Sequence, residues 1–290
     1  MDVKEWEKHK AHRQQVVADV GQWIGLADEN GEPIMDIPSA IELSAPETRG
    51  EPAALKLTVS VTNMYGQLSP LVGELIADKL GVVDDQGQLV PIVDATRFVV
   101  IERAGVRRTF RVEFVVAEGA GSRPSTLTIH GTDMLKVLSR FPAMSAPTTW
   151  ENKWRRFTRD WVGPDNTSVG FVKPRDLAGM TMVTVADGAT VSGPAEQVIR
   201  RVVSESFEAA FRLTGVKKPY PVQVIPQSRS SKISPTLLLR PTDKSLWEEV
   251  APHAALAGVR LSAFMWWPGD TQPPGLELSQ PTIVISCEQT

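Results

Sequence analysis

The stretch that decides the fold is RFVVIERAGVRRTFRVEFVV, which occupies residues 97–116. Residues 97–101 and 109–116 are short runs rich in valine and phenylalanine, a composition that is typical of β-strands. Residues 103–106 between them are few and include a glycine, so the two runs are predicted to form an antiparallel hairpin. We therefore expect a fold built on an antiparallel sheet.

Further strands are predicted on both sides of this hairpin. Residues 55–59 and 125–129 alternate apolar and polar side chains, as strands with one buried face do. One helix interrupts the strands, with Pro70 at its first position and Gly81 as its stop signal. Residues 22–140 are thus predicted to form a β-barrel-like domain with an inserted helix.

The first 21 residues form a separate, charged segment. It contains no glycine or proline before Gly21, which predicts a helix, and it has too few apolar residues to form a core of its own. This N-terminal arm is expected to pack on a neighbouring domain or on a partner subunit. Its apolar anchors are Trp6, Val16, Val17 and Val20.

The second half of the chain contains the clearest helix, over residues 194–213, where apolar side chains repeat at helical spacing. Another helix is predicted over 244–257, because Ser245 and Glu248 form a capping box at its start. Pro252 is expected to kink or split that helix. Strands are predicted to follow at residues 259–266 and 281–287.

These elements assign the chain to the α+β class, dominated by sheet. The predicted order is an arm over 1–21, the β-barrel-like domain over 22–140, a proline-broken bridging segment over 141–192, and a smaller α+β domain over 193–290.

The composition is that of a folded protein without a strong overall charge. The chain has 290 residues, 42% of them hydrophobic, which is enough to build two domains. Its net charge of −3 does not favour binding to nucleic acid. Cys287 is the only cysteine, so an intrachain disulfide and a thiolate metal cluster are excluded. The sequence shows no bilayer-spanning run and no signal peptide, so we expect synthesis and assembly in a bacterial cytoplasm.

The polar residues give little indication of catalysis. His9 and His12 lie one helical turn apart, but the lysines and arginines around them disfavour a divalent cation. Asp133 beside His130 is interpreted as a helix cap rather than as half of an acid–base pair. No nucleophile elbow or phosphate-binding loop is present, and a carboxylate pair that only folding brings together stays open. We expect no enzymatic activity, no metal and no cofactor.

Aromatic and basic residues alternate between Trp150 and Trp161. We interpret this strip as a partly buried helix that packs against the core or a neighbouring subunit, because tryptophan and arginine are enriched at interface hot spots. Trp266 and Trp267 are adjacent on a predicted strand, so one is expected in the core and the other exposed or at an interface. The predicted partner-contact residues are Trp6, Trp150, Trp154, Arg155, Arg156, Trp266 and Trp267.

Three stretches carry a resemblance to a known family. Residues 22–28, QWIGLAD, follow the charged helix as a strand with an acidic turn, and residues 127–140, LTIHGTDMLKVLSR, combine a strand, a Gly-x-Asp turn and a leucine-rich helix. Residues 245–270 add a helix, a strand and the loop WWPGD. In this order they resemble the minor tail proteins of siphoviruses that infect actinobacteria, a family similar to the tail-tip baseplate hub.

The resemblance implies a structural protein of the virion at the tail tip. It implies a homotrimeric ring that joins the distal tail protein to other minor tail proteins and surrounds the end of the tape-measure protein. Such a hub lets DNA pass without specific binding and does not insert into a membrane. Two alternatives remain, a carbohydrate-binding adhesion module that uses tryptophans as sugar platforms and a tail-associated cell-wall hydrolase.

Overall fold

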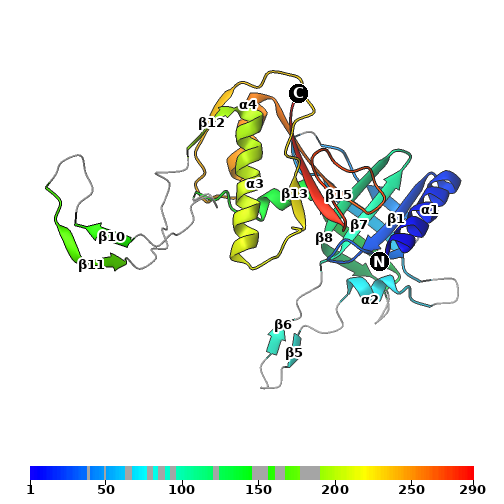
Figure 1. Ribbon diagram of the computed structural model, residues 1–290. Helices are drawn as coiled ribbons and strands as arrows, with labels where there is room; N and C mark the ends of the chain where they lie inside the picture. The colour runs from blue at the N-terminus through cyan, green and yellow to red at the C-terminus, as the bar shows by residue number, and fades with distance from the viewer. Residues whose placement is uncertain are drawn as a thin grey trace.

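The computed structural model describes residues 1–37, 40–48, 50–62, 67–76, 81–83, 89–91, 96–119, 124–145, 156–160, 167–176 and 190–290. These residues form two packed domains and two β-hairpins, one of β5 and β6 and one of β10 and β11, that stand apart from the domains (Figure 1). The chain is α+β with sheet dominating, as predicted from the sequence.

The first domain is a seven-stranded sheet in the order β2-β1-β7-β8-β9-β4-β3, and every neighbouring pair is antiparallel. The predicted hairpin at its centre is confirmed as β7 and β8, joined by a tight turn at Ala104 and Gly105. The strands are β1 (Gln22–Ala27), β2 (Pro33–Asp36), β3 (Ala40–Ser44), β4 (Ala54–Ser60), β7 (Phe98–Arg103), β8 (Val106–Glu118) and β9 (Thr126–Asp133).

The sheet curls around one apolar core without closing into a barrel. Strands β1, β4, β7, β8 and β9 all send side chains into this core, among them Leu26, Leu57, Phe110 and Ile129. A closed barrel would require β2 and β3 to pair, and in the described part of the chain these two strands are the edges of the sheet. The predicted barrel is therefore an open, curled sheet.

The helix inserted in the sheet, α2 (Leu71–Leu75), is shorter than predicted. It begins after Pro70, and the side chain of Ser69 accepts a hydrogen bond from the Leu71 amide at 3.3 Å. It ends at Ile76, whose backbone is extended, before the predicted stop at Gly81. Two short strands follow it, β5 (Gly81–Val83) and β6 (Leu89–Pro91).

The N-terminal helix, α1 (Val3–Val20), packs on β1 and β7 of its own chain. Its start is fixed by a capping box between Asp2 and Glu5. Trp6 and Arg13 are its buried residues, whereas the predicted anchor Val20 is 71% exposed. The arm thus packs on its own chain, and Val20 takes no part in that packing.

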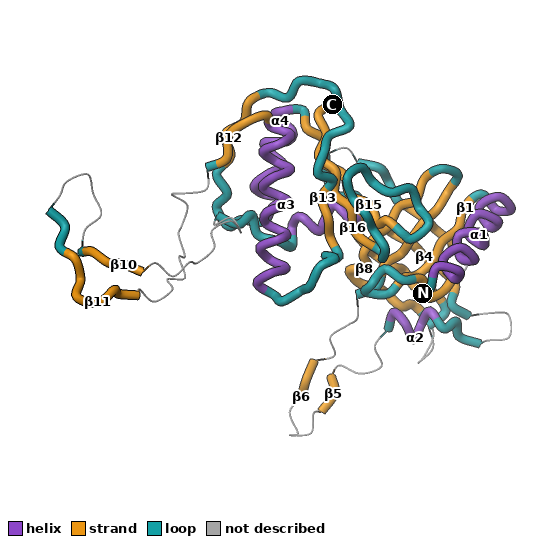
Figure 2. Tube along the Cα trace, in the orientation of Figure 1, coloured by secondary structure: helices purple, strands orange, loops and turns teal. Residues whose placement is uncertain are grey.

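The second domain packs two helices on one face of a three-stranded sheet (Figure 2). Both predicted helices are confirmed as α3 (Ala195–Leu213) and α4 (Leu246–Ala257), with the capping box of Ser245 and Glu248 in place. α4 runs through Pro252 without being split. The sheet has the order β13 (Val222–Val224), β16 (Thr282–Gln289), β15 (Val259–Trp266), and a ribbon of β12 (Val191–Pro194) and β14 (Thr236–Leu239) lies beside it.

A short 3₁₀ helix, η1 (Met134–Ser139), connects the two domains. Asp133 caps it by accepting a hydrogen bond from the Leu135 amide at 3.1 Å, as predicted, and also accepts one from the Ala53 amide at 3.0 Å. Leu135 and Leu138 belong to the core of the second domain. Met134 of the same helix belongs to the cluster that also contains residues of β1 and β7, so η1 contacts both domains.

The hairpin that follows the bridging segment's first residues and stands apart from the domains consists of β10 (Arg156–Arg159) and β11 (Gly170–Asp176) (Figure 1). The sequence predicted a helix here, because basic and aromatic residues alternate over three turns. The described part of that strip is a strand, paired antiparallel with β11. The rest of the strip lies outside the described residues.

Candidate functional site at the junction of the two domains

Three of the predicted partner-contact residues are buried inside the chain itself. Trp6, Trp266 and Trp267 are 4%, 2% and 1% exposed. Trp266 and Trp267 enter different apolar clusters, and both clusters are buried, so neither tryptophan is exposed, and Trp267 lies where the two domains meet. Arg156 is the first residue of β10, and its side chain lies outside the described part of the structure. The remaining predicted residues, Trp150, Trp154 and Arg155, lie outside the described part of the chain.

The two domains meet at a buried cluster, which we call the junction. The N-terminal helix, β1 and β7 provide most of its residues, η1 provides one, and the end of β15 with the following loop provides the rest. Its members are Trp6, Trp23, Ala27, Phe98, Val100, Met134, Met265 and Trp267.

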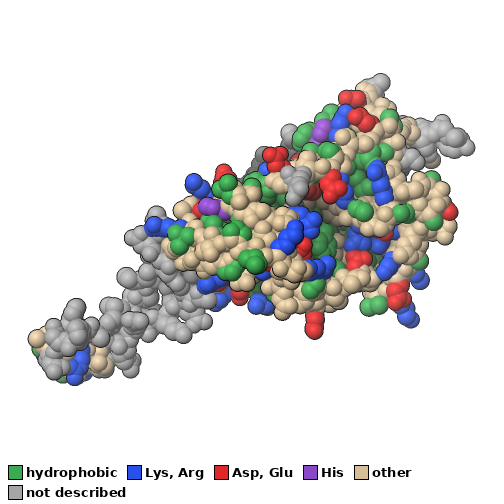
Figure 3. Space-filling view, turned by 90° about the horizontal axis from the view of Figure 1, so that it is seen from above, with side chains coloured by type: hydrophobic (Ala, Val, Ile, Leu, Met, Phe, Trp, Pro, Cys, Tyr) green, Lys and Arg blue, Asp and Glu red, His purple; other side chains and the backbone are tan. Residues whose placement is uncertain are grey.

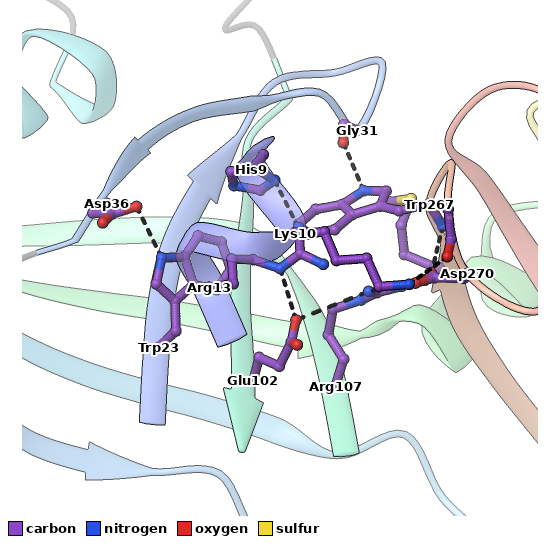
Figure 4. Close-up of polar contacts among 12 residues, drawn as sticks. His9, Lys10, Arg13, Trp23, Gly31, Asp36, Glu102, Arg107, Trp267 and Asp270 are labelled. Atoms are coloured by element: carbon purple, nitrogen blue, oxygen red, sulfur yellow. Dashed lines mark hydrogen bonds and ion pairs between the residues drawn. The ribbon is translucent and has the colours of Figure 1, made fainter. Parts of the chain in front are cut away.

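Trp267 is the residue of the second domain that lies deepest in the junction (Figure 4). Its ring centroid is 5.5 Å from that of Trp6 and 6.3 Å from that of Trp23, both at tilted or edge-on angles that aromatic pairs favour. Its indole Nε1 donates a hydrogen bond to the Gly31 carbonyl at 2.8 Å. Both the apolar ring and the indole N–H of Trp267 therefore have their partners in the first domain.

Arg13 of α1 is only 2% exposed and lies against these rings. Its guanidinium carbon is 4.7 Å from the Trp267 ring centroid and 5.7 Å from that of Trp23, as in cation–π contacts. Its Nε donates to Glu102 of β7 at 2.8 Å. Burial lowers the pKa of the guanidinium, and Glu102 opposes that shift. The group remains charged because arginine titrates far above neutral pH.

A second arginine, Arg107 at the start of β8, also contacts the junction. Its guanidinium carbon lies 4.5 Å from the Trp267 ring centroid, and it forms an ion pair with Asp270. It also donates to the Met265 carbonyl at 3.0 Å. Asp270 in turn accepts a hydrogen bond from the Trp267 amide at 2.9 Å, which fixes the loop that carries the tryptophan.

His9 and His12 of α1 point to different partners and do not converge on one site. His9 packs between the rings of Trp6, Trp23 and Trp267, and its Nδ1 accepts a hydrogen bond from Arg13 at 2.7 Å. Burial lowers the pKa of His9 to about 4, and the nearby Arg13 adds to that shift, so the imidazole is neutral at pH 7. His12 lies 2.6 Å from Asp36, which also accepts from Trp23 Nε1 at 2.8 Å.

Other buried polar groups also have structural partners. Arg200 and Glu196 form an ion pair within α3, where Arg200 donates to the Cys287 carbonyl at 2.7 Å and Glu196 accepts from the Gln289 amide at 3.0 Å. Burial raises the pKa of the Cys287 thiol to about 12, so it is protonated and unreactive at pH 7.

The described residues contain neither a metal-binding cluster nor a membrane-spanning helix. No three of the His, Cys, Asp and Glu side chains described lie close enough to hold a metal ion together. None of the described helices is both long and apolar enough to cross a membrane.

Sequence reasoning singled out Trp6 and Trp267 of the junction, as partner-contact residues, but neither Trp23 nor the charged residues. Arg13 follows Trp6 by seven residues, which places both on one face of a helix, and this spacing was the available signal. Arg107 and Glu102 lie on two different strands and meet Arg13 and Asp270 only in the folded chain. No local pattern indicates those pairs.

Comparison with known proteins finds only distant likenesses among solved structures. No family model matches the chain, and no curated protein matches it. Among solved structures, it is similar to a prophage tail protein from Listeria monocytogenes, with 8% identity, a TM-score of 0.40 and 91% of this chain covered. It is also similar to a tail protein from Neisseria meningitidis, with 11% identity, a TM-score of 0.34 and 91% covered. The chain spans 50% of the length of each of these two proteins.

Proposed function

We propose that this chain is a structural component of a phage tail tip, a minor tail or baseplate-hub protein rather than an enzyme. In this proposal three copies form a ring that connects the distal tail protein to the tip proteins and surrounds the end of the tape-measure protein. The chain would assemble in the host cytoplasm and reside in the virion. DNA would pass through the ring without specific binding.

The observation that carries the proposal is the junction. A ring subunit transmits load between its neighbours, so its domains must keep one relative orientation. Here Trp267 of the second domain is buried among Trp6 and Trp23 of the first, and two arginines contact its ring. Interfaces with a large apolar core resist relative domain motion, whereas small polar interfaces permit it. The buried cation Arg13, which is paired with Glu102, also supports this packing.

The sequence resemblance is the second support, because its stretches fall on elements that build the junction. QWIGLAD contains β1 with Trp23, LTIHGTDMLKVLSR contains β9 and η1 with Met134, and WWPGD contains Trp267 and Asp270. The motifs that resemble the tail-protein family are thus the ones that join the two domains.

The adhesion alternative would use Trp150, Trp154, Trp266 or Trp267 as a sugar platform, and the last two do not fit that role. Trp266 and Trp267 are buried, and a sugar needs an exposed aromatic face. The cell-wall hydrolase alternative is tested separately by zymography of the purified chain on host cell walls, where a cleared band at its mass would contradict the structural assignment.

Antibody-gold labelling of intact source particles is the decisive test of location. The proposal expects label only at the tail tip. Label on side fibres would favour adhesion, and particles without any label would refute a virion role. Native mass spectrometry of the purified chain tests the ring, for which a mass of three copies is expected.

A further inference from the structure

A groove borders the junction on its solvent side and has no role in the function proposed above. It has a volume of about 540 Å³ and lies between α1, the β7–β8 turn and the end of β15. Seen from above, basic and acidic side chains gather around the hollow between the two domains (Figure 3). Because β15 is the last strand of its sheet, the groove follows a sheet edge.

Two cations at the rim of this groove have no carboxylate partner among the described residues. Lys10 of α1 donates to the Gly269 carbonyl, and Arg103 of β7 donates to Gln22 Oε1 at 3.2 and 3.3 Å. Both acceptors are neutral oxygens. The deeper cations differ, since Arg13 is paired with Glu102 and Arg107 with Asp270. The unbalanced charge of the groove is therefore positive and lies at its rim.

The same groove exposes apolar side chains. Val106 at the tip of the β7–β8 turn is 58% exposed, and Phe264 of β15 is 37% exposed. Both belong to the residues that line the groove, together with the half-buried Val17 of α1. Exposed aliphatic and aromatic side chains thus line the same groove as the two unbalanced cations, and the surface has both apolar and electrostatic character.

We infer that this groove is a docking site for a protein segment that carries a carboxylate next to an apolar side chain. The carboxylate would contact Lys10 or Arg103 at the rim, and the apolar side chain would cover Val106 and Phe264. The segment belongs to a different protein. The segment must carry a negative charge, because a basic or uncharged segment would leave both cations without a counter-charge. The inference does not depend on the proposed tail function.

The test is a selection of random twelve-residue peptides on the purified full chain. We expect enrichment of peptides with Asp or Glu beside an apolar residue. The charge-reversal variant Lys10→Glu/Arg103→Glu should bind these peptides about tenfold more weakly or worse, since each rim charge contributes modestly. The control Arg229→Glu/Lys232→Glu makes the same charge change at exposed positions outside the groove and should bind like the wild type.

A neutral variant keeps the test decisive if charge reversal impairs folding. Lys10→Gln/Arg103→Gln removes the charges without repulsion, and thermal unfolding of each variant establishes that it is folded. The inference is overturned if no acidic peptide is enriched, or if enriched peptides bind wild type and folded variants equally. It is also overturned if the reversal changes the mass of a self-assembled species, because the groove would then hold a second copy of this chain.

Discussion

The outer face of the curled sheet has two halves, which share one core but differ in what covers their outer side chains. On β1 and β7 the outer side chains, such as Trp23 and Val100, are buried under α1 and Trp267. On β8, β9 and β4 the outer side chains face solvent, with Phe114 57% and Val116 41% exposed. We call these the covered half and the open half.

The sequences of the strands account for this difference between the two halves. The covered half has continuous apolar runs, Trp23 to Ala27 and Phe98 to Ile101, because both faces of these strands are buried. The open half alternates, so that Leu55, Leu57 and Val59 point inward while the residues between them are polar. Continuous runs thus predict a cover, and alternation predicts one free face.

The largest expected effect comes from removing the tryptophan that covers the sheet. Trp267→Ala should lower the free energy of unfolding by about 3–5 kcal/mol, since a large ring is lost from a fully buried site. Chemical denaturation followed by circular dichroism measures the change. A loss below about 1 kcal/mol would show that the second domain does not hold the covered half.

Breaking the buried ion pair should have the next largest effect. Arg13→Met leaves Glu102 without its nearest cation, although Arg107 remains 3.9 Å away. We expect a loss of about 2–3 kcal/mol in unfolding free energy. Lys56→Met is the matched control in the open half, because its ion pair with Glu42 is exposed on both sides and should contribute less than about 1 kcal/mol. Equal losses for the two variants would contradict the distinction.

The covered half should also be sensitive to pH through His9. Its pKa is lowered from 6.5 to about 4 on folding, so the unfolded chain binds more protons between these two values. Stability is therefore full above pH 6.5 and falls as the pH decreases towards 4, by about 1–2 kcal/mol once partial solvent exposure is considered. His9→Asn should remove this part of the slope in denaturation curves measured from pH 7 to 4. Identical slopes for both proteins would refute the assignment.

The smallest effect is expected on the open half. Phe114 stacks on His130 with ring centroids 4.4 Å apart, but it covers no buried residue of the core clusters. Phe114→Thr keeps a residue that favours strands and should change the unfolding free energy by about 0.5 kcal/mol or less. A thermal melt of purified protein is sufficient, and a loss near that of Trp267→Ala would mean that this face is covered as well.

The sequence by itself determined the local elements of this protein. The hairpin of residues 97–116, the helices α1, α3 and α4 and the caps at Asp133 and Ser245 follow from side-chain patterns and from hydrogen bonds within a few residues. These features depend on near neighbours in the chain, so their signals are local. The strip around residue 156 shows the limit of this reasoning, because four residues that resembled a helix pair instead with β11 as a strand.

Only the tertiary structure decided how these elements cover one another. The sequence predicts that α1 packs on a neighbouring domain or on a partner subunit, and the folded chain buries its Trp6 against Trp267, which lies 261 positions later in the sequence. The sheet stays open because its edge strands do not meet, and Arg107 finds Asp270 across the two domains. Such pairings join residues that are remote in sequence, and their energy comes from burial and charge at one place in space. The periodicity of side chains along the sequence therefore does not predict these pairings.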